Sequence, residues 1–381
     1  MTLKKLSILL TAIILLIPGL QSETDYTTSF NGKIVIRNDQ TLFTAFAYVT
    51  IGSFKAVDRD RMPPLKEFVW KRLDSGLDPG YKQKIRQDIA PYLTDRMFEY
   101  NLTMLALNCS PPPHIRFLKE ELEAHILSRG GDVERTMKTF KGLEKFPALL
   151  TGFYEKAGIA HLYEDCRPWY DEAIAVYKEK TSRLLDRALK YLKIQPEEIS
   201  LPYDKVVIIL NLIGPRGSAM GPIWKGVKYD VHSPWDSLSW SPHEFIHDMV
   251  APVTKSVKYK AEILRLVEKV RAGIKDSAAE QYYQDPIDFF DECLVRTLDH
   301  LVTSDWSKSW ERERVKEALA AQASRGFVLC RPMLESLALY ENSALTFYEY
   351  FPGFLASVGQ RIEPGLSDKW AGESCSGQIK E

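Results

Sequence analysis

The stretch Ser241-Pro242-His243-Glu244-Phe245-Ile246-His247-Asp248-Met249-Val250 contains the pattern H-E-x-x-H. Residues four apart on a helix lie on the same face, so His243 and His247 can each present a ring nitrogen to one ion. Glu244, next to the first histidine, then reaches a water on that ion rather than the ion itself. Zinc hydrolases use this arrangement, so the stretch predicts a zincin-like fold with a small, partly antiparallel sheet beside the motif helix.

Each residue type in the motif has a chemical role. Zinc lowers the pKa of a bound water to about 7, and Glu244 can act as the general base that takes its proton. We therefore predict a secreted metallopeptidase that hydrolyses peptide bonds with one catalytic Zn²⁺ ion and takes a peptide or protein as substrate. The pattern does not separate an endopeptidase from an exopeptidase.

The same stretch also fits an ordinary helix start. With Ser241 at the N-cap, Pro242 at the first helical position and Glu244 at the third, it forms a capping box. Capping does not explain why a chain with seven histidines places two of them four apart around a glutamate. Two alternatives to an enzyme stay open: a catalytically inactive zincin-fold binding protein with a structural or vestigial metal, and a helical protein without a metal.

A catalytic zinc needs a third protein ligand and an open position, and in glutamate-zincins that ligand is a glutamate on a later helix. The sequence from Asp285 to His300 predicts such a helix, with Asp285 as its cap and Glu292 as the third ligand. An ordinary ion pair with Arg296 is the alternative role of Glu292. Further acidic and imidazole groups of this helix are rival ligands or can orient a zinc-bound imidazole, namely Asp288, Asp291, His300 and, for the orienting role, Asp299.

Peptide hydrolysis also needs a hydrogen-bond donor for the oxyanion. Three tyrosines of the C-terminal helical stretch are candidates, and Tyr340 is taken as the catalytic one ahead of Tyr348 and Tyr350. The alternative is that these aromatic residues belong to the core, as aromatic residues at helical spacing usually do.

The rest of the chain predicts a mostly helical α+β protein. Strand-like runs occur at 33–37, 206–210 and 226–231, the last as an antiparallel partner at the sheet edge, where an extended peptide could add as a strand. Helical patterns fill most of the remainder: 42–49, 65–73, 81–106, 115–128, 133–157, 167–193, 255–272, 286–304, 310–323 and 328–360.

The N-terminus has the composition of a secretory signal peptide. Lys4 and Lys5 precede the apolar run Leu6–Ile17, which is short for a spanning helix, and Ser22 suits a cleavage site. The predicted regions are a signal peptide (1–22), a mainly helical N-terminal region (23–200), a metal-site region (201–364) and a loose tail (365–381). We expect a secreted or periplasmic protein without stable membrane association after cleavage, with an uncleaved signal anchor as the alternative.

Charge and cysteine content indicate no further partner. Fifty Lys and Arg residues nearly balance fifty-one Asp and Glu residues, so no overall field would draw the chain to nucleic acid. The five cysteines form no C-x-x-C pair, and their disulfide connectivity cannot be read from sequence.

Two motifs together resemble a family of secreted proteins defined by a domain of unknown function, which carries H-E-F-x-H followed by E-x-L-V-R. The matching residues are 243–247 and 292–296, and the resemblance extends over most of the mature chain. It implies a zincin-like metallopeptidase with His243, His247 and Glu292 as zinc ligands and Glu244 as the catalytic acid/base. The gap between His247 and Glu292 is longer than in thermolysin-like peptidases, and the helix near 255–272 must fill it.

Overall fold

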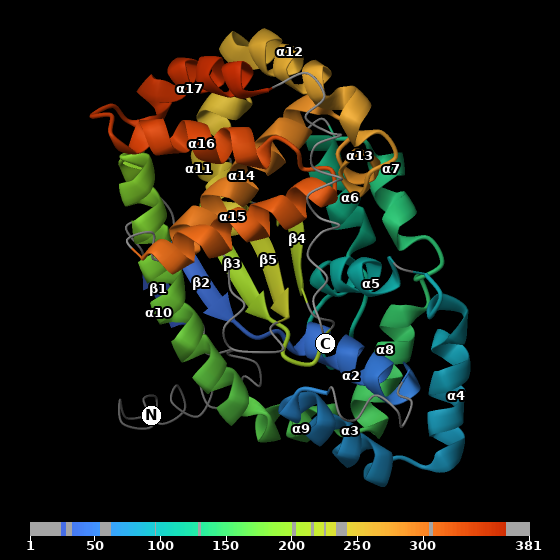
Figure 1. The fold of residues 1–381 in the computed structure, drawn as a ribbon. Coiled ribbons are helices and arrows are strands. Elements are labelled where there is room, and N and C mark those ends of the chain that lie inside the picture. Colours follow the sequence, from blue (N-terminus) through green and yellow to red (C-terminus); the bar gives the residue numbers. More distant parts are fainter. Residues whose placement is uncertain are drawn as a thin grey trace, which may run out of the picture. The chain divides into compact units, whose positions relative to one another are not determined.

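The protein is described by a computed structural model, and the chain forms two compact units. Among the described residues, the first unit holds the five strands, helices α2 to α9 and the first part of α10, and the second holds the end of α10 and helices α11 to α17 (Figure 1). The structure describes residues 24–27, 33–53, 62–95, 97–128, 131–199, 203–214, 217–224, 226–233, 242–304 and 308–362. The predicted signal peptide, residue 241 and the predicted tail lie outside these ranges.

The first unit is built on a five-stranded mixed sheet with the strand order β1-β2-β3-β5-β4 (Figure 1). Strands β2, β3 and β5 are parallel neighbours, whereas β1 and β4 pair antiparallel at the two edges. The strands are β1 (Thr24–Thr27), β2 (Lys33–Arg37), β3 (Lys205–Leu210), β4 (Gly217–Trp224) and β5 (Val227–Ser233). The centre of β3 is buried on both faces, as its unbroken β-branched run predicts.

Two predictions about the strand at 226–231 are wrong. This strand, β5, runs parallel to β3 and not antiparallel to it. It also lies between β3 and β4, so that it has no open edge to which a peptide could add. The predicted strands did not include β4. Its sequence, Gly217–Trp224, contains Gly221 and Pro222 and therefore looks like a turn.

The helices of the first unit follow the predicted pattern with more breaks. Helix α2 begins after Asp39, whose carboxylate accepts a hydrogen bond from the Leu42 amide at 2.9 Å, and most of its residues are buried. The helices are α2 (Gln40–Ser53), α3 (Pro64–Gly76), α4 (Pro79–Ile89), α5 (Phe98–Leu107), α6 (Lys119–Ser128), α7 (Val133–Met137), α8 (Phe146–Lys156), α9 (Ile159–Asp165) and α10 (Arg167–Leu192).

In the second unit, α14 is the central helix. It contacts α11, α12, α15 and α16, and from Phe289 to Val295 every residue is buried. A helix that is surrounded in this way holds its side chains in fixed positions, including the polar ones. The helices of this unit are α11 (His243–Thr254), α12 (Val257–Ile274), α13 (Ala278–Tyr282), α14 (Pro286–Thr303), α15 (Ser309–Ser324), α16 (Cys330–Glu341) and α17 (Phe347–Arg361).

The predicted class, predominantly helical with a small sheet, is confirmed. Several predicted long helices are broken in the structure: 81–106 divides into α4 and α5, and 328–360 divides into α16 and α17. Residues 203–233 lie in the first unit, whereas the predicted regions grouped them with the metal site. Over the described residues, no helix combines the length and apolarity that a membrane span requires.

Candidate metal centre

Helix α11 carries both histidines of the H-E-x-x-H motif in its first two turns. The helix begins at His243, with Pro242 in the N-cap position and no side-chain cap, so the helix start differs by one residue from the predicted capping box. Phe245, Ile246, Met249 and Val250 are buried and fix the helix by its apolar face. The two imidazoles consequently project on the remaining face, one turn apart.

Helix α14 carries Glu292 on the buried part of its surface. Asp285 caps the helix as predicted, because its carboxylate accepts a hydrogen bond from the Ile287 amide at 2.7 Å, and Pro286 follows at the first helical position. The Glu292 side chain is only 3% exposed. A buried carboxylate requires compensating partners, and the structure provides them on both of its oxygens.

The structure brings His243, His247 and Glu292 together. The two Nε2 atoms lie 3.3 Å apart, and Glu292 Oε2 lies 3.5 Å from Nε2 of His243 and 3.3 Å from Nε2 of His247. In a regular tetrahedron with bonds of 2.0–2.1 Å, the typical range for zinc, ligand atoms are separated by about 3.3–3.4 Å. The three atoms therefore form a nearly equilateral triangle of the size that one face of a tetrahedral zinc site requires.

Asp291 orients the second histidine. Its Oδ2 accepts a hydrogen bond from His247 Nδ1 at 2.6 Å, which leaves Nε2 as the nitrogen that faces His243 and Glu292. The other carboxylate oxygen accepts a hydrogen bond from the Thr254 hydroxyl, and Lys255 Nζ lies 3.8 Å from Oδ2. A ring nitrogen held by a carboxylate in this way fixes the tautomer that metal ligation needs.

Glu292 also forms the ion pair that the sequence offered as the alternative to a ligand role. Its Oε1 lies 2.5 Å from Nη2 of Arg296, one turn further along α14. The two roles are compatible because each one uses a different oxygen. The structure thus shows both contacts at once, one facing the histidines and one facing Arg296.

The charges in this cluster act strongly on its titratable groups. Burial acts to lower the pKa of His247, but the contacts with Asp291 and Glu292 outweigh it and raise that pKa to about 10. Burial acts to raise the pKa of Glu292, but the contacts with His243, His247 and Arg296 hold that pKa well below its usual range. A proton on the half-buried His247 imidazole therefore occupies the same negative pocket that a metal ion would occupy.

Glu244, the acidic residue of the H-E-x-x-H motif, lies in the first turn of α11 and is half-buried. Its negative charge is a small contribution to the raised pKa of His247. Asp299, predicted to orient an imidazole, has Oδ2 4.0 Å from Nδ1 of His243, which is a longer contact than the one Asp291 makes with His247.

Two of the rival ligands on α14, Asp288 and Asp291, face other groups. Asp288 is exposed and pairs with Lys255. Asp291 binds the Nδ1 side of His247, which is the side opposite to the three converging atoms. His300 lies in the last turn of the helix, two turns beyond Glu292.

The structure corrects the choice of Tyr340 as an oxyanion donor. Tyr340 is completely buried, and its ring packs on Tyr350 and Phe347 with centroid separations of 5.3 and 5.5 Å. A hydroxyl inside this aromatic core cannot reach a substrate. Tyr348 instead donates a hydrogen bond to the Met249 carbonyl of α11 at 2.7 Å, so its role is to hold the motif helix.

Two residues near the centre were missed in the sequence. Thr254, which donates to Asp291, lies two turns after His247 on the same face of α11, a spacing that could have identified it. No sequence pattern pointed to Tyr283, because this residue precedes α14 in an irregular segment. Burial, followed by the charge of Glu292, raises the pKa of Tyr283 to about 12, although Arg296 opposes this.

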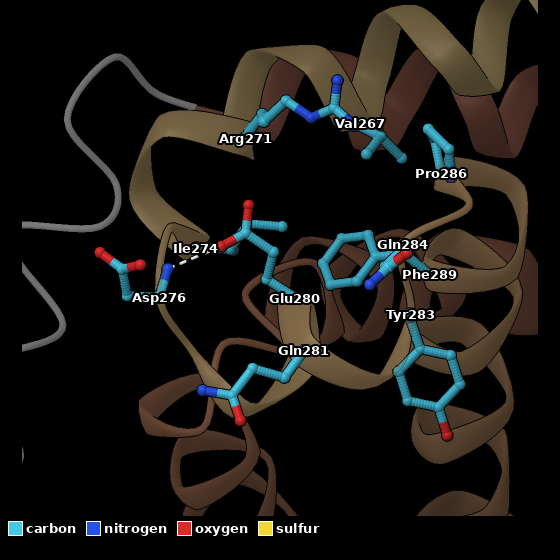
Figure 2. A pocket seen from close by; sticks show the side chains of 10 residues that line it. All are labelled: Val267, Arg271, Ile274, Asp276, Glu280, Gln281, Tyr283, Gln284, Pro286 and Phe289. Carbon is cyan, nitrogen blue, oxygen red and sulfur yellow. Dashed lines mark hydrogen bonds between the residues drawn. The ribbon is translucent and has the colours of Figure 1, made fainter.

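Tyr283 also lines a cavity of about 440 Å³ beside helices α12 and α13 (Figure 2). The walls include Val267 and Phe289, and Arg271 and Glu280 bring opposite charges. In Figure 2 the Tyr283 hydroxyl points away from Val267 and Arg271. None of the three converging residues lines this cavity, so it is distinct from the metal centre.

Comparisons with protein-family models, with curated proteins and with solved structures find no match to this chain. The resemblance to a family with H-E-F-x-H and E-x-L-V-R therefore stays a prediction. The functional argument depends on the geometry of the centre itself.

Proposed function

We propose that the protein is a secreted, zinc-dependent metallopeptidase with a zincin-like active site. One observation carries the proposal: the mutual separations of His243 Nε2, His247 Nε2 and Glu292 Oε2, 3.3 to 3.5 Å, match one face of a tetrahedral zinc site. Two imidazoles and one carboxylate are also the ligand set of catalytic zinc in thermolysin-like enzymes, which keep the fourth position for water or substrate.

The chain's own residues divide the work. His243, His247 and Glu292 would hold the ion, and Asp291 fixes the ring of His247. When bound, zinc supplies a Lewis acid for a carbonyl oxygen and lowers the pKa of water to about 7. Glu244 accepts the proton of the attacking water and delivers it to the leaving amine, a general acid–base role that contributes about 10²–10⁴-fold to rate.

Metal analysis and the variant Glu244→Gln test this function. The purified protein should hold about one zinc per chain. Turnover of a peptide library should stop when a chelator removes the metal and should return when zinc is added. Glu244→Gln should lose hydrolysis by about 10²–10⁴-fold while it keeps the metal, because Glu244 is not one of the three converging residues.

A matched control is Glu268→Gln on α12, where the glutamate side chain is 72% exposed. This variant should retain both zinc and turnover. Full activity in Glu244→Gln would exclude the proposed mechanism. Zinc retention without turnover on any peptide, in the unaltered chain, would instead favour the non-catalytic binding protein.

A further inference from the structure

Arg296 occupies an unusual place beside the proposed metal centre. Its Nη2 lies 2.5 Å from Oε1 of Glu292, while Oε2 of the same carboxylate faces the two histidines. The carboxylate is 3% exposed and the Arg296 side chain is 21% exposed, so water screens this pair weakly.

Arg296 is itself held in place from two further directions. Its Nη1 donates a hydrogen bond to Oε1 of Gln322 at 3.1 Å. Its guanidinium carbon lies 4.1 Å from the centroid of the Phe327 ring, within the range of a cation–π contact. These contacts, together with the ion pair, hold the guanidinium beside Glu292.

The consequence concerns how Glu292 can bind an ion. A carboxylate can bind a metal through one oxygen or through both, and binding through both fills an additional coordination position. Here Oε1 already forms a close ion pair with a guanidinium group that stays protonated in proteins. The guanidinium also places a permanent positive charge near the position of the cation.

We infer that Arg296 is a positioning residue that restricts Glu292 to one-oxygen coordination, which keeps a coordination position open for substrate and lowers the metal affinity. This inference rests on the proposed function, because it assumes that the three converging residues hold zinc. It assigns to Arg296 a role beyond that of an ordinary i,i+4 ion pair, which would stabilise the helix alone.

Two variants separate the side-chain contact at Oε1 from the charge of Arg296. Arg296→Met removes both, so that Oε1 becomes free to bind the metal. The zinc affinity should rise at least about tenfold, because a unit positive charge within several ångströms of a divalent ion is removed, and their repulsion exceeds this amount even when water screens the pair more strongly than an effective dielectric constant near 20. Arg296→Gln removes the charge and keeps an amide donor, so affinity should rise while the one-oxygen coordination persists.

The experiment measures zinc affinity by competition with a chromophoric chelator, and coordination number by X-ray absorption on the zinc-loaded full chain. Cobalt substitution gives a second spectrum, because four-coordinate cobalt absorbs visible light more strongly than five- or six-coordinate cobalt. The matched control is Arg331→Met, which removes another arginine of an i,i+4 pair, with Glu335 at 3.0 Å. Neither its affinity nor its spectrum should change.

The outcomes separate this inference from the proposed function. A higher coordination number and a tighter zinc complex in Arg296→Met support the inference, whether or not any peptide is cleaved. An unchanged affinity and spectrum, with a loss of thermal stability only, would reduce Arg296 to a structural residue. If Arg296→Met does not fold, the affinity of Arg296→Gln decides. An unaltered chain that binds no zinc would overturn both proposals.

Discussion

At the scale of single residues, the geometry of the candidate centre depends on which atom of each side chain already contacts another residue. Asp291 takes the Nδ1 side of His247, and Arg296 takes Oε1 of Glu292. The atoms left over, Nε2 and Oε2, are those that converge. The sequence could name His243, His247 and Glu292, but it could not divide the roles of Asp291 and Glu292, because adjacent residues on one helix differ in direction by only about a third of a turn.

Asp291→Asn should weaken zinc binding by about 10–100-fold, the usual cost of removing a partner that orients a ligating histidine. The amide can still accept one hydrogen bond, but it lacks the charge that favours the tautomer with Nε2 free. Titration against a competing chelator measures the effect. Asp288→Asn is the control, since Asp288 lies one turn earlier, is 58% exposed and pairs with Lys255. Equal affinities in both variants would contradict the role given to Asp291.

At the scale of elements, helix α11 requires support from outside itself. Pro252 lies inside this helix and lacks the amide that would bind the carbonyl one turn before it, which weakens a helix interior. The Tyr348 hydroxyl of α17 donates to the carbonyl of Met249 in the same part of the helix. The motif helix is therefore held near its proline by a contact that spans 99 residues of sequence.

Tyr348→Phe should lower the free energy of unfolding by about 1 kcal/mol, the net value of one intramolecular hydrogen bond, and should leave peptide turnover nearly unchanged. Tyr340→Phe is the matched control, because among the described residues the buried Tyr340 hydroxyl has no hydrogen-bond partner. Its stability should stay the same or rise. Urea unfolding curves measure the stability of both variants. A large loss of peptide turnover in Tyr348→Phe, with normal stability, would instead indicate that Tyr348 has a catalytic role.

The periodic sequence patterns predicted most helices, because amphipathic spacing is a local property. Helix α10 lies within the predicted helix 167–193, and its apolar residues, Ile174, Tyr177, Leu184, Leu185, Ala188 and Leu192, are buried. Strand pairing is not a local property. The sequence patterns predicted β3 and β5 as strands, but their parallel alignment depends on β4, which pairs antiparallel with β5 at the edge of the sheet. The glycines and the proline of β4 hid this strand from a sequence pattern. Loop breaks such as 342–346 were also hidden, since both flanking helices continue the same apolar pattern.

At the scale of the whole molecule, each unit has its own buried polar groups, and His232 is the clearest in the first unit. It lies at the end of β5 opposite Leu210 of β3, is 8% exposed, and its ring is 6.1 Å from that of Tyr177. The structure places its side chain in the interior. Burial, with the nearby charge of Lys228 as a smaller cause, lowers the pKa of His232 to about 4.

This lowered pKa predicts a loss of stability in acid. Between about pH 6.5 and pH 4 the unfolded chain binds a proton at His232 that the folded chain does not bind, so the free energy of unfolding falls as the pH falls. The shift corresponds to roughly 3 kcal/mol over this range, and the contribution is constant above about pH 7. His232→Gln should flatten this part of the stability curve, measured by urea unfolding at several pH values. His114→Gln, at an exposed histidine, should leave the slope unchanged. An identical slope in His232→Gln and the unaltered chain would show that other groups cause the acid sensitivity.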